Sequence, residues 1–167
     1  MTSEVPVIYL ARHGETAWSL TGQHTGLTDL PLTERGEQNA RALGERLIGL
    51  SFTKVFTSPL QRAARTCELA GFGAVAEVDR DLLEWNYGQY EGRRTAEVHA
   101  ERPDWQLFRD GCPGGESPGQ VGARADHVLS RYVLCKAMCC CFRVAISCGC
   151  SLPAGSGLNR QPEGFSC

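Results

Sequence analysis

Short apolar runs alternate with amphipathic stretches along the first half of the chain. The run Val5–Ala11 is β-rich and nearly uncharged, which predicts a buried parallel strand. Apolar residues then recur at helical spacing between residues 34 and 50, and Thr33 is placed to cap that helix. The run Lys54–Thr57 predicts a second, shorter strand.

The next helix is expected to begin beside a group of basic residues. Ser58 and Pro59 have the residue types of a cap and a first helical residue. Arg62 then falls in an early turn, where free backbone N–H groups favour an anion. A further strand-like run, residues 75–83, is expected to deliver Glu84 at its end.

The rest of the pattern completes an alternation of strands and helices. Helical stretches are predicted at 95–101, 104–109 and 120–131, with a loop rich in glycine and proline at 111–119. This order predicts an α/β fold, a doubly wound and mostly parallel sheet with helices on both faces.

The first strand ends in a group of residues that suits an anionic ligand. Arg12 and His13 place a cation and an imidazole at the carboxyl edge of the sheet, where open α/β folds bind ligands. Gly14 lets backbone N–H groups approach an anion closely. Three residues recur by chance, however, so this tripeptide needs support from other motifs.

Further motifs follow in a recognisable order. They are Glu15–Ser19, Gly22–Gly26, Thr28–Thr33, Phe56–Thr66, Glu84–Gly92 and Arg109–Glu116. In this order and spacing the chain resembles the histidine phosphatase superfamily, which includes the cofactor-dependent phosphoglycerate mutases. It is most similar to the sugar-phosphatase members, and the resemblance covers roughly residues 5 to 131.

The resemblance implies a mechanism that suits these residue types. His13 would attack phosphorus with a neutral ring nitrogen and form a phosphohistidine. Arg12 and Arg62 would hold the phosphate through their planar guanidinium groups. Glu84 would protonate the leaving alcohol and then activate water, which requires a raised carboxylate pKa. The alternatives are a structural histidine at a strand end and a surface glutamate.

The resemblance also implies a set of substrate-binding positions. These are Gly14, Ser19, Thr25, Gly26 and Tyr87. His24 lies in the same glycine-rich segment, where it could contact substrate, but it is expected at the rim of the site. His99 and His127 fall within predicted helices and are expected on helix surfaces.

The end of the chain departs from the family. The superfamily has a second histidine after a late strand, but this chain has four histidines and the last is His127. Of the nine cysteines, seven lie from Cys135 onward. We therefore divide the chain into an incomplete histidine phosphatase domain, residues 1–131, and an aberrant cysteine-rich tail, residues 132–167.

A shifted reading frame accounts for the tail. When each new codon takes the last base of one codon and two bases of the next, Met138–Cys139 must encode valine. The pairs within Cys139–Cys141 must likewise encode two leucines. Permitted codons then give Ser-Gly-His, with the histidine codon straddling Ala145 and Ile146. In the given chain the segment Cys139–Ser147 is apolar and β-branched enough to occupy the vacant strand position beside the first strand.

A metal module is the competing interpretation of the tail. Its ligands would come from Cys135, Cys139–Cys141, Cys148 and Cys150. Structural zinc sites favour two separated pairs of cysteines, and a run of three does not easily place its thiolates tetrahedrally. We therefore predict no metal site.

Composition excludes several classes of partner. The net charge of −2 and 22% charged residues give no basic field for nucleic acid or an anionic membrane. The first residues lack the features of a signal peptide, and no apolar run reaches the ~20 residues of a membrane span. These features predict a cytoplasmic protein, and they indicate no oligomeric state.

The expected activity is hydrolysis of a small phosphomonoester, such as a sugar phosphate, without metal or cofactor. This chain is expected to be impaired because the second histidine is missing. One alternative is phosphoryl transfer of the mutase type. Another is an inactive remnant or a phosphate-binding protein that is not an enzyme.

Overall fold

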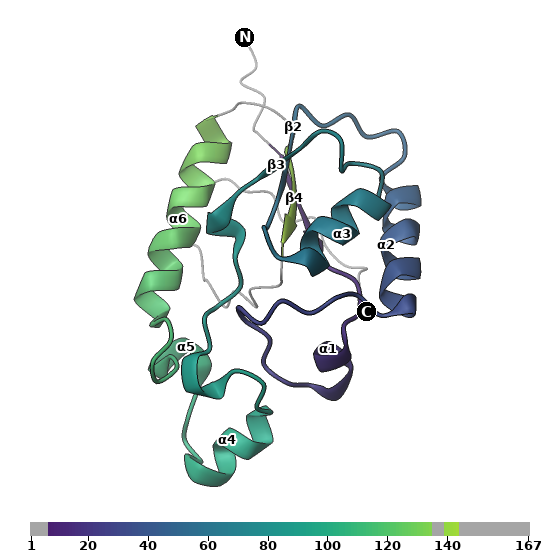
Figure 1. The fold of residues 1–167 in the computed structure, drawn as a ribbon. Coiled ribbons are helices and arrows are strands. Elements are labelled where there is room, and N and C mark those ends of the chain that lie inside the picture. Colours follow the sequence, from purple (N-terminus) through teal and green to yellow (C-terminus); the bar gives the residue numbers. More distant parts are fainter. Residues whose placement is uncertain (1–6, 135–138, 144–167) are drawn as a thin grey trace.

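The computed structural model describes residues 7–134 and 139–143, and within them the chain forms a four-stranded parallel sheet (Figure 1). The strands are β1 Ile8–Arg12, β2 Lys54–Thr57, β3 Ala76–Val78 and β4 Cys139–Arg143. Their spatial order is β1-β4-β2-β3, and every pairing is parallel. The mostly parallel sheet predicted from the sequence is confirmed.

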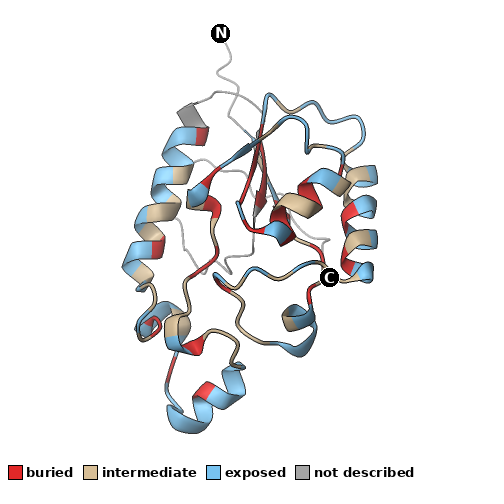
Figure 2. Cartoon of the chain, viewed as in Figure 1, coloured by how far each residue is buried: buried red, intermediate tan, exposed pale blue. Residues whose placement is uncertain are grey.

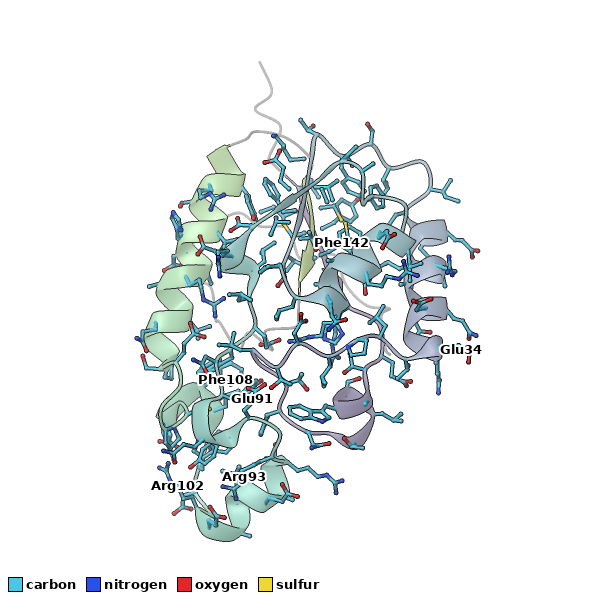
Figure 3. The ribbon with its side chains drawn as sticks, viewed as in Figure 1. Glu34, Glu91, Arg93, Arg102, Phe108 and Phe142 are labelled. Carbon is cyan, nitrogen blue, oxygen red and sulfur yellow. The ribbon has the colours of Figure 1, made fainter. Side chains whose placement is uncertain are left out.

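Helices cover both faces of this sheet. On one face α2 (Glu34–Arg46) and α3 (Gln61–Leu69) pack together, and α6 (Pro118–Leu134) lies on the other (Figure 1). Successive side chains of β4 point to opposite faces of the sheet, as in any pleated strand, so they pack against the helices on both sides. Phe142, labelled in Figure 3, belongs to the core cluster on the α3 side, while Cys141 packs with Tyr132 of α6. Figure 2 shows the resulting buried positions along the strands.

The departing tail supplies an interior strand of the sheet. Residues Ile8–Arg12 of β1 pair in register with Cys139–Arg143, and β2 pairs with the other edge of β4. The prediction that this segment lies beside the first strand is therefore confirmed for residues 139–143. The remainder, 144–147, lies outside the described residues, and so do the positions of the shifted histidine codon.

The cysteines of β4 contribute to the apolar core. Cys140 and Cys141 are fully buried, and they belong to clusters on opposite faces of the sheet. Thiols on opposite faces cannot share one tetrahedral metal. Residues 7–134 and 139–143 hold no group of three His, Cys, Asp or Glu side chains suited to a metal ion. Cys135, Cys148 and Cys150 lie outside the described residues.

Several helix boundaries differ from the prediction. The helix expected at 104–109 is α5 (Leu107–Asp110), and the one expected at 120–131 is the longer α6. Helix α2 ends at Arg46 instead of residue 50, because the chain turns through Gly49 at a φ of 87°. Helix α3 begins at Gln61, and Ser58 does not cap it. Its first N–H group donates instead to Asp29 Oδ1, at 2.8 Å. A carboxylate 32 positions earlier in the chain therefore fixes where α3 begins.

The run predicted as one strand over residues 75–83 is broken. Strand β3 has three residues, and a 3₁₀ turn, η1 (Arg80–Leu82), follows it. The carboxylate of Asp79 accepts hydrogen bonds from the Asp81 N–H and from the buried Tyr132 hydroxyl. Glu84 therefore follows a turn and not the end of a strand.

Several short elements surround the ends of the strands. They are α1 (Ala17–Thr21), η2 (Gly88–Tyr90), α4 (Thr95–Glu101) and α5 (Leu107–Asp110). The bounds of α4 are those predicted. Helix α1 was not predicted, because five residues are too few for a periodic pattern. It is fixed by the reciprocal hydrogen bonds of Thr16 and Ser19, which form a capping box.

Helix α6, with 17 residues, is the longest helix in the part of the chain that the structure describes. None of the helices in residues 7–134 combines the length and the apolar character needed to cross a bilayer.

Two glycines allow the segment after β1 to lie against α2. A Cβ atom on Gly36 would stand 2.2 Å from the Glu15 carbonyl oxygen, and one on Gly14 would stand 2.2 Å from the Gly36 oxygen. These are backbone atoms, so no side chain can swing away to make room. This contact holds the chain on which His13 sits against the start of α2.

The Gly36→Ala variant is expected to lose at least about 2 kcal/mol of unfolding free energy, because the methyl group must push two backbone segments apart. Gly122→Ala in α6 is the matched control, since a Cβ there meets nothing within 4 Å. It should be unchanged or up to about 1 kcal/mol more stable, from helix propensity. Urea unfolding of both variants is the measurement, and equal stabilities would contradict the close contact.

Candidate functional site

A cavity of about 200 Å³ opens at the carboxyl end of β1. Its lining residues come from the end of β1, from α1 and the loop after it, and from the segment after η1. They are Arg12, His13, Ser19, Gly22, Gln23, His24, Thr25, Glu84 and Tyr87. Six of the nine predicted site residues are among them. The other three, Gly14, Gly26 and Arg62, are buried and do not line the cavity.

The imidazole of His13 is held in one tautomer. Its Nδ1 lies 2.6 Å from the Gly14 carbonyl oxygen, which can only accept, so Nδ1 carries the proton. The lone pair therefore falls on Nε2. Burial lowers the pKa of His13 to about 4; the Gly14 hydrogen bond opposes this effect, and the charges of Arg62 and Arg12 add to it. At neutral pH the ring is uncharged and its Nε2 can act as a nucleophile.

This lowered pKa predicts a loss of stability in acid. Between pH 6.5 and about 4 an unfolded His13 binds a proton that the folded ring does not, so stability falls as the pH falls through this window. The loss should reach about 2 kcal/mol, less than the full shift implies because the ring is partly exposed. The unfolding free energy, measured by urea unfolding, should fall between pH 7 and pH 4.5 in both proteins, and the fall should be about 2 kcal/mol smaller in His13→Asn than in the parent chain. Parallel losses in the two proteins would contradict the lowered pKa.

Glu84 is the acidic group of the cavity. It is only 4% exposed, and its Oε1 accepts a hydrogen bond from the Trp85 N–H at 2.9 Å. Its charge acts on two neighbours. It helps burial to raise the pKa of Tyr87, and it opposes the effect by which burial lowers the pKa of Arg62. The carboxylate is therefore close enough to the Tyr87 phenol and the Arg62 guanidinium for its charge to act on both.

The guanidinium of Arg62 bonds a loop. The side chain is fully buried, its Nη1 donates to the Thr28 carbonyl oxygen at 2.8 Å, and its Nη2 donates to that of Gly26 at 2.7 Å. Both arms of the fork predicted to hold phosphate thus hold the loop after α1. Nε is buried and has no hydrogen-bond partner among the described residues. Phosphate binding by Arg62 stays a prediction.

Arg12 is placed differently. It is the last residue of β1, its side chain lines the cavity and it is exposed. The charges of the exposed Arg12 and the buried Arg62 both act on the His13 ring and help to lower its pKa.

Gly14 and Gly26 have structural roles in this arrangement. The Gly14 N–H donates to Thr66 Oγ1 at 3.1 Å, and that of Gly26 donates to Glu91 Oε1 at 2.8 Å. Glu91 is labelled in Figure 3. A Cβ on Gly26 would stand 2.3 Å from the Trp85 carbonyl oxygen. Both glycines permit close approach of two backbones, and the anion-facing N–H group expected at Gly14 is used internally.

The aliphatic hydroxyl groups in the lining, those of Ser19 and Thr25, already have partners. Ser19 Oγ donates to the Thr16 carbonyl oxygen and accepts from the Thr16 N–H, at 2.9 and 2.8 Å. Thr25 Oγ1 donates to the Gln23 carbonyl oxygen at 3.1 Å. A ligand can therefore only donate to Ser19 unless the cap of α1 opens.

Comparison with known families identifies this arrangement. The model of the histidine phosphatase superfamily (branch 1) matches residues 8–136. The chain belongs to this superfamily. The family resemblance and the fold class predicted from the motifs are confirmed.

Curated relatives of this histidine phosphatase domain carry phosphatase and mutase names. An acid phosphatase of Mycobacterium tuberculosis is 44% identical over 137 residues, which cover 76% of this chain and 67% of that protein. Sedoheptulose 1,7-bisphosphatase of Saccharomyces cerevisiae is 39% identical, with coverages of 78% and 57%. A probable phosphoglycerate mutase GpmB of Salmonella choleraesuis is 37% identical, with coverages of 74% and 61%. The chain thus spans 57% to 67% of the length of these relatives.

Solved structures of the superfamily share the fold. The structure of the Rv3214 product of Mycobacterium tuberculosis superposes with a TM-score of 0.78 at 39% identity, covering 82% of this chain and 72% of that one.

The remaining histidines of this histidine phosphatase domain differ in their roles. His24, expected at the rim, lines the cavity, and Gln23 and Gly22 beside it were not predicted. The motif Gly22–Gly26 was the sequence signal that could have assigned Gly22, Gln23 and His24 to the cavity lining. His99 and His127 are exposed on α4 and α6, as predicted.

Proposed function

We propose that this histidine phosphatase domain hydrolyses small phosphomonoesters through a phosphohistidine at His13. The observation that carries the proposal is the imidazole itself. Its Nδ1 is bonded to the Gly14 carbonyl, its Nε2 lone pair is available, and it shares a cavity with Arg12 and Glu84. The family and the phosphatase names of the relatives support the same chemistry.

The proposed reaction has two steps. In the first, His13 Nε2 attacks phosphorus, the bond to the ester oxygen breaks, and Glu84 gives the leaving alkoxide its proton. In the second, Glu84 takes a proton from water, the water attacks phosphorus, and phosphate leaves with the bond to Nε2 broken. Arg12 offsets the charge that spreads over the phosphoryl oxygens.

We further propose that this particular chain is impaired. The family's second histidine is absent from the sequence, and the tail that should supply it fits a shifted reading frame. The cavity suits a small-molecule substrate such as a sugar phosphate. The proposal requires no metal or organic cofactor, and it places the protein in the cytoplasm.

Phosphoryl transfer of the mutase type is the second candidate. The relatives named as probable phosphoglycerate mutases favour it. A mutase must keep water from the phosphohistidine until the phosphoryl group returns to an acceptor. Release of inorganic phosphate without an added acceptor distinguishes hydrolysis from transfer, and no turnover with intact phosphate binding would indicate a binding protein.

Trapping the intermediate tests the proposal directly. Incubation with p-nitrophenyl phosphate, a quench in alkali that preserves phosphohistidine, and peptide mass spectrometry should place one phosphoryl group on His13. His127→Ala, a change on the exposed surface of α6, should label equally. Absence of label, or label on a serine or carboxylate, would refute the phosphohistidine route.

A further inference from the structure

His24 is part of a stack of rings on one side of the cavity. Its imidazole lies against the Tyr87 ring, with centroids 4.7 Å apart and planes 23° apart. The edge of Trp105 approaches from another direction, with centroids 5.8 Å apart. His24 and Tyr87 both line the cavity, while Trp105 is buried behind them. The imidazole therefore lines the cavity and is held in place by its contacts with the Tyr87 and Trp105 rings.

The backbone of His24 is fixed as well. Its N–H donates to the Arg93 carbonyl oxygen, and its own carbonyl accepts from the Gly92 N–H, both at 2.8 Å. These bonds join the loop after α1 to the segment before α4. Substitution of the side chain leaves both of them in place, so the ring can be altered without releasing the loop.

The ring of His24 offers an uncharged polar edge. Burial lowers its pKa, and the charge of Glu91 only partly opposes this effect, so the imidazole is neutral at pH 7. Its Nε2 lies 3.4 Å from Thr95 Oγ1. Nδ1 has no hydrogen-bond partner among the residues that the structure describes. One ring nitrogen is thus occupied by the protein and the other remains for a ligand.

We propose that His24 selects the alcohol part of the substrate, through a hydrogen bond between its Nδ1 and a hydroxyl group of that alcohol. The stacked Tyr87 holds the ring in place, and His13 with Arg12 receives the phosphoryl end. The site then prefers phosphate esters of hydroxylated alcohols over esters of the same size that lack hydroxyl groups. This inference rests on the proposed function, because it assumes that the phosphoryl group binds at His13.

A matched pair of ligands tests the inference. Glycerol 1-phosphate and n-propyl phosphate have the same carbon chain and differ in two hydroxyl groups, and inorganic phosphate reports the phosphoryl site alone. Calorimetric titration should show glycerol 1-phosphate binding about 3- to 10-fold more tightly than n-propyl phosphate, the range of one hydrogen bond. His24→Phe keeps a stacking ring and removes the nitrogen, so it should abolish this preference. His24→Asn keeps a polar atom near the place of Nδ1, so it should retain part of it.

The outcomes separate the two proposals. Inorganic phosphate should bind all three proteins equally, and failure to bind the parent chain would refute the phosphoryl site and the selection together. Equal phosphate binding with an unchanged ligand preference in His24→Phe would refute only the role of His24. A uniform loss of affinity for all three ligands in His24→Phe would show a structural role and would also overturn the inference.

Discussion

Restoring the reading frame of the tail is expected to raise the turnover of phosphate esters on the order of 10²–10³-fold. If the tail is frameshifted as proposed, the restored chain regains the second histidine, which the family resemblance implies lies opposite His13; removal of one preorganised electrostatic partner typically costs that factor. Both proteins should be assayed side by side with p-nitrophenyl phosphate, and their melting temperatures compared. Equal turnover would show that the second histidine is dispensable here and that the account of the tail is wrong.

A control separates the imidazole from any repair of the fold. In the restored chain, alanine in place of the recovered histidine keeps the rest of the tail. Its turnover should fall to that of the present chain while its melting temperature stays high. A large fall in melting temperature with the alanine change would instead assign the gain to stability.

Replacement of His13 by alanine in the restored chain should have a still larger effect. Loss of a nucleophile that forms a covalent intermediate removes the whole route, and comparable losses in hydrolases reach on the order of 10⁴-fold or more. The expected signature is a lower kcat with phosphate binding retained through Arg12. His127→Ala is the matched control, because His127 is exposed on α6 and contacts Asp81. A His13→Ala enzyme within tenfold of its parent would exclude His13 as the nucleophile.

Local patterns in the sequence predicted the elements that depend on local physics. Strand β1 and helix α4 follow from an apolar run and a short amphipathic stretch, and β4 follows from apolar character and a vacant place in the sheet. The start of α3 was misplaced because its first donor is satisfied by Asp29, which no local pattern connects to it. The helix propensity of the residues around Gln61 carries no information about a contact with a residue 32 positions away.

The site shows the same division between local and tertiary information. The order of the motifs predicted that His13 and Glu84 share one cavity, and both line it, although Glu84 follows a 3₁₀ turn and not the end of a strand. The direction of the Arg62 side chain depended on three carbonyl groups of a loop more than 30 positions earlier. His24 was assigned to the rim because its support, Tyr87, lies far along the chain.

The order of synthesis gives the position of β4 a further consequence. Ile8 finds its partner in Cys139, so β1 leaves the ribosome 131 residues before the strand that pairs with it. β2 borders the same place and also awaits β4. Until then the nascent chain holds two strands with open edges, the kind of surface that aggregates or recruits chaperones. Pairing across so long a stretch of chain makes folding of this domain slow, because the sheet cannot be completed before residues 139–143 have been synthesised.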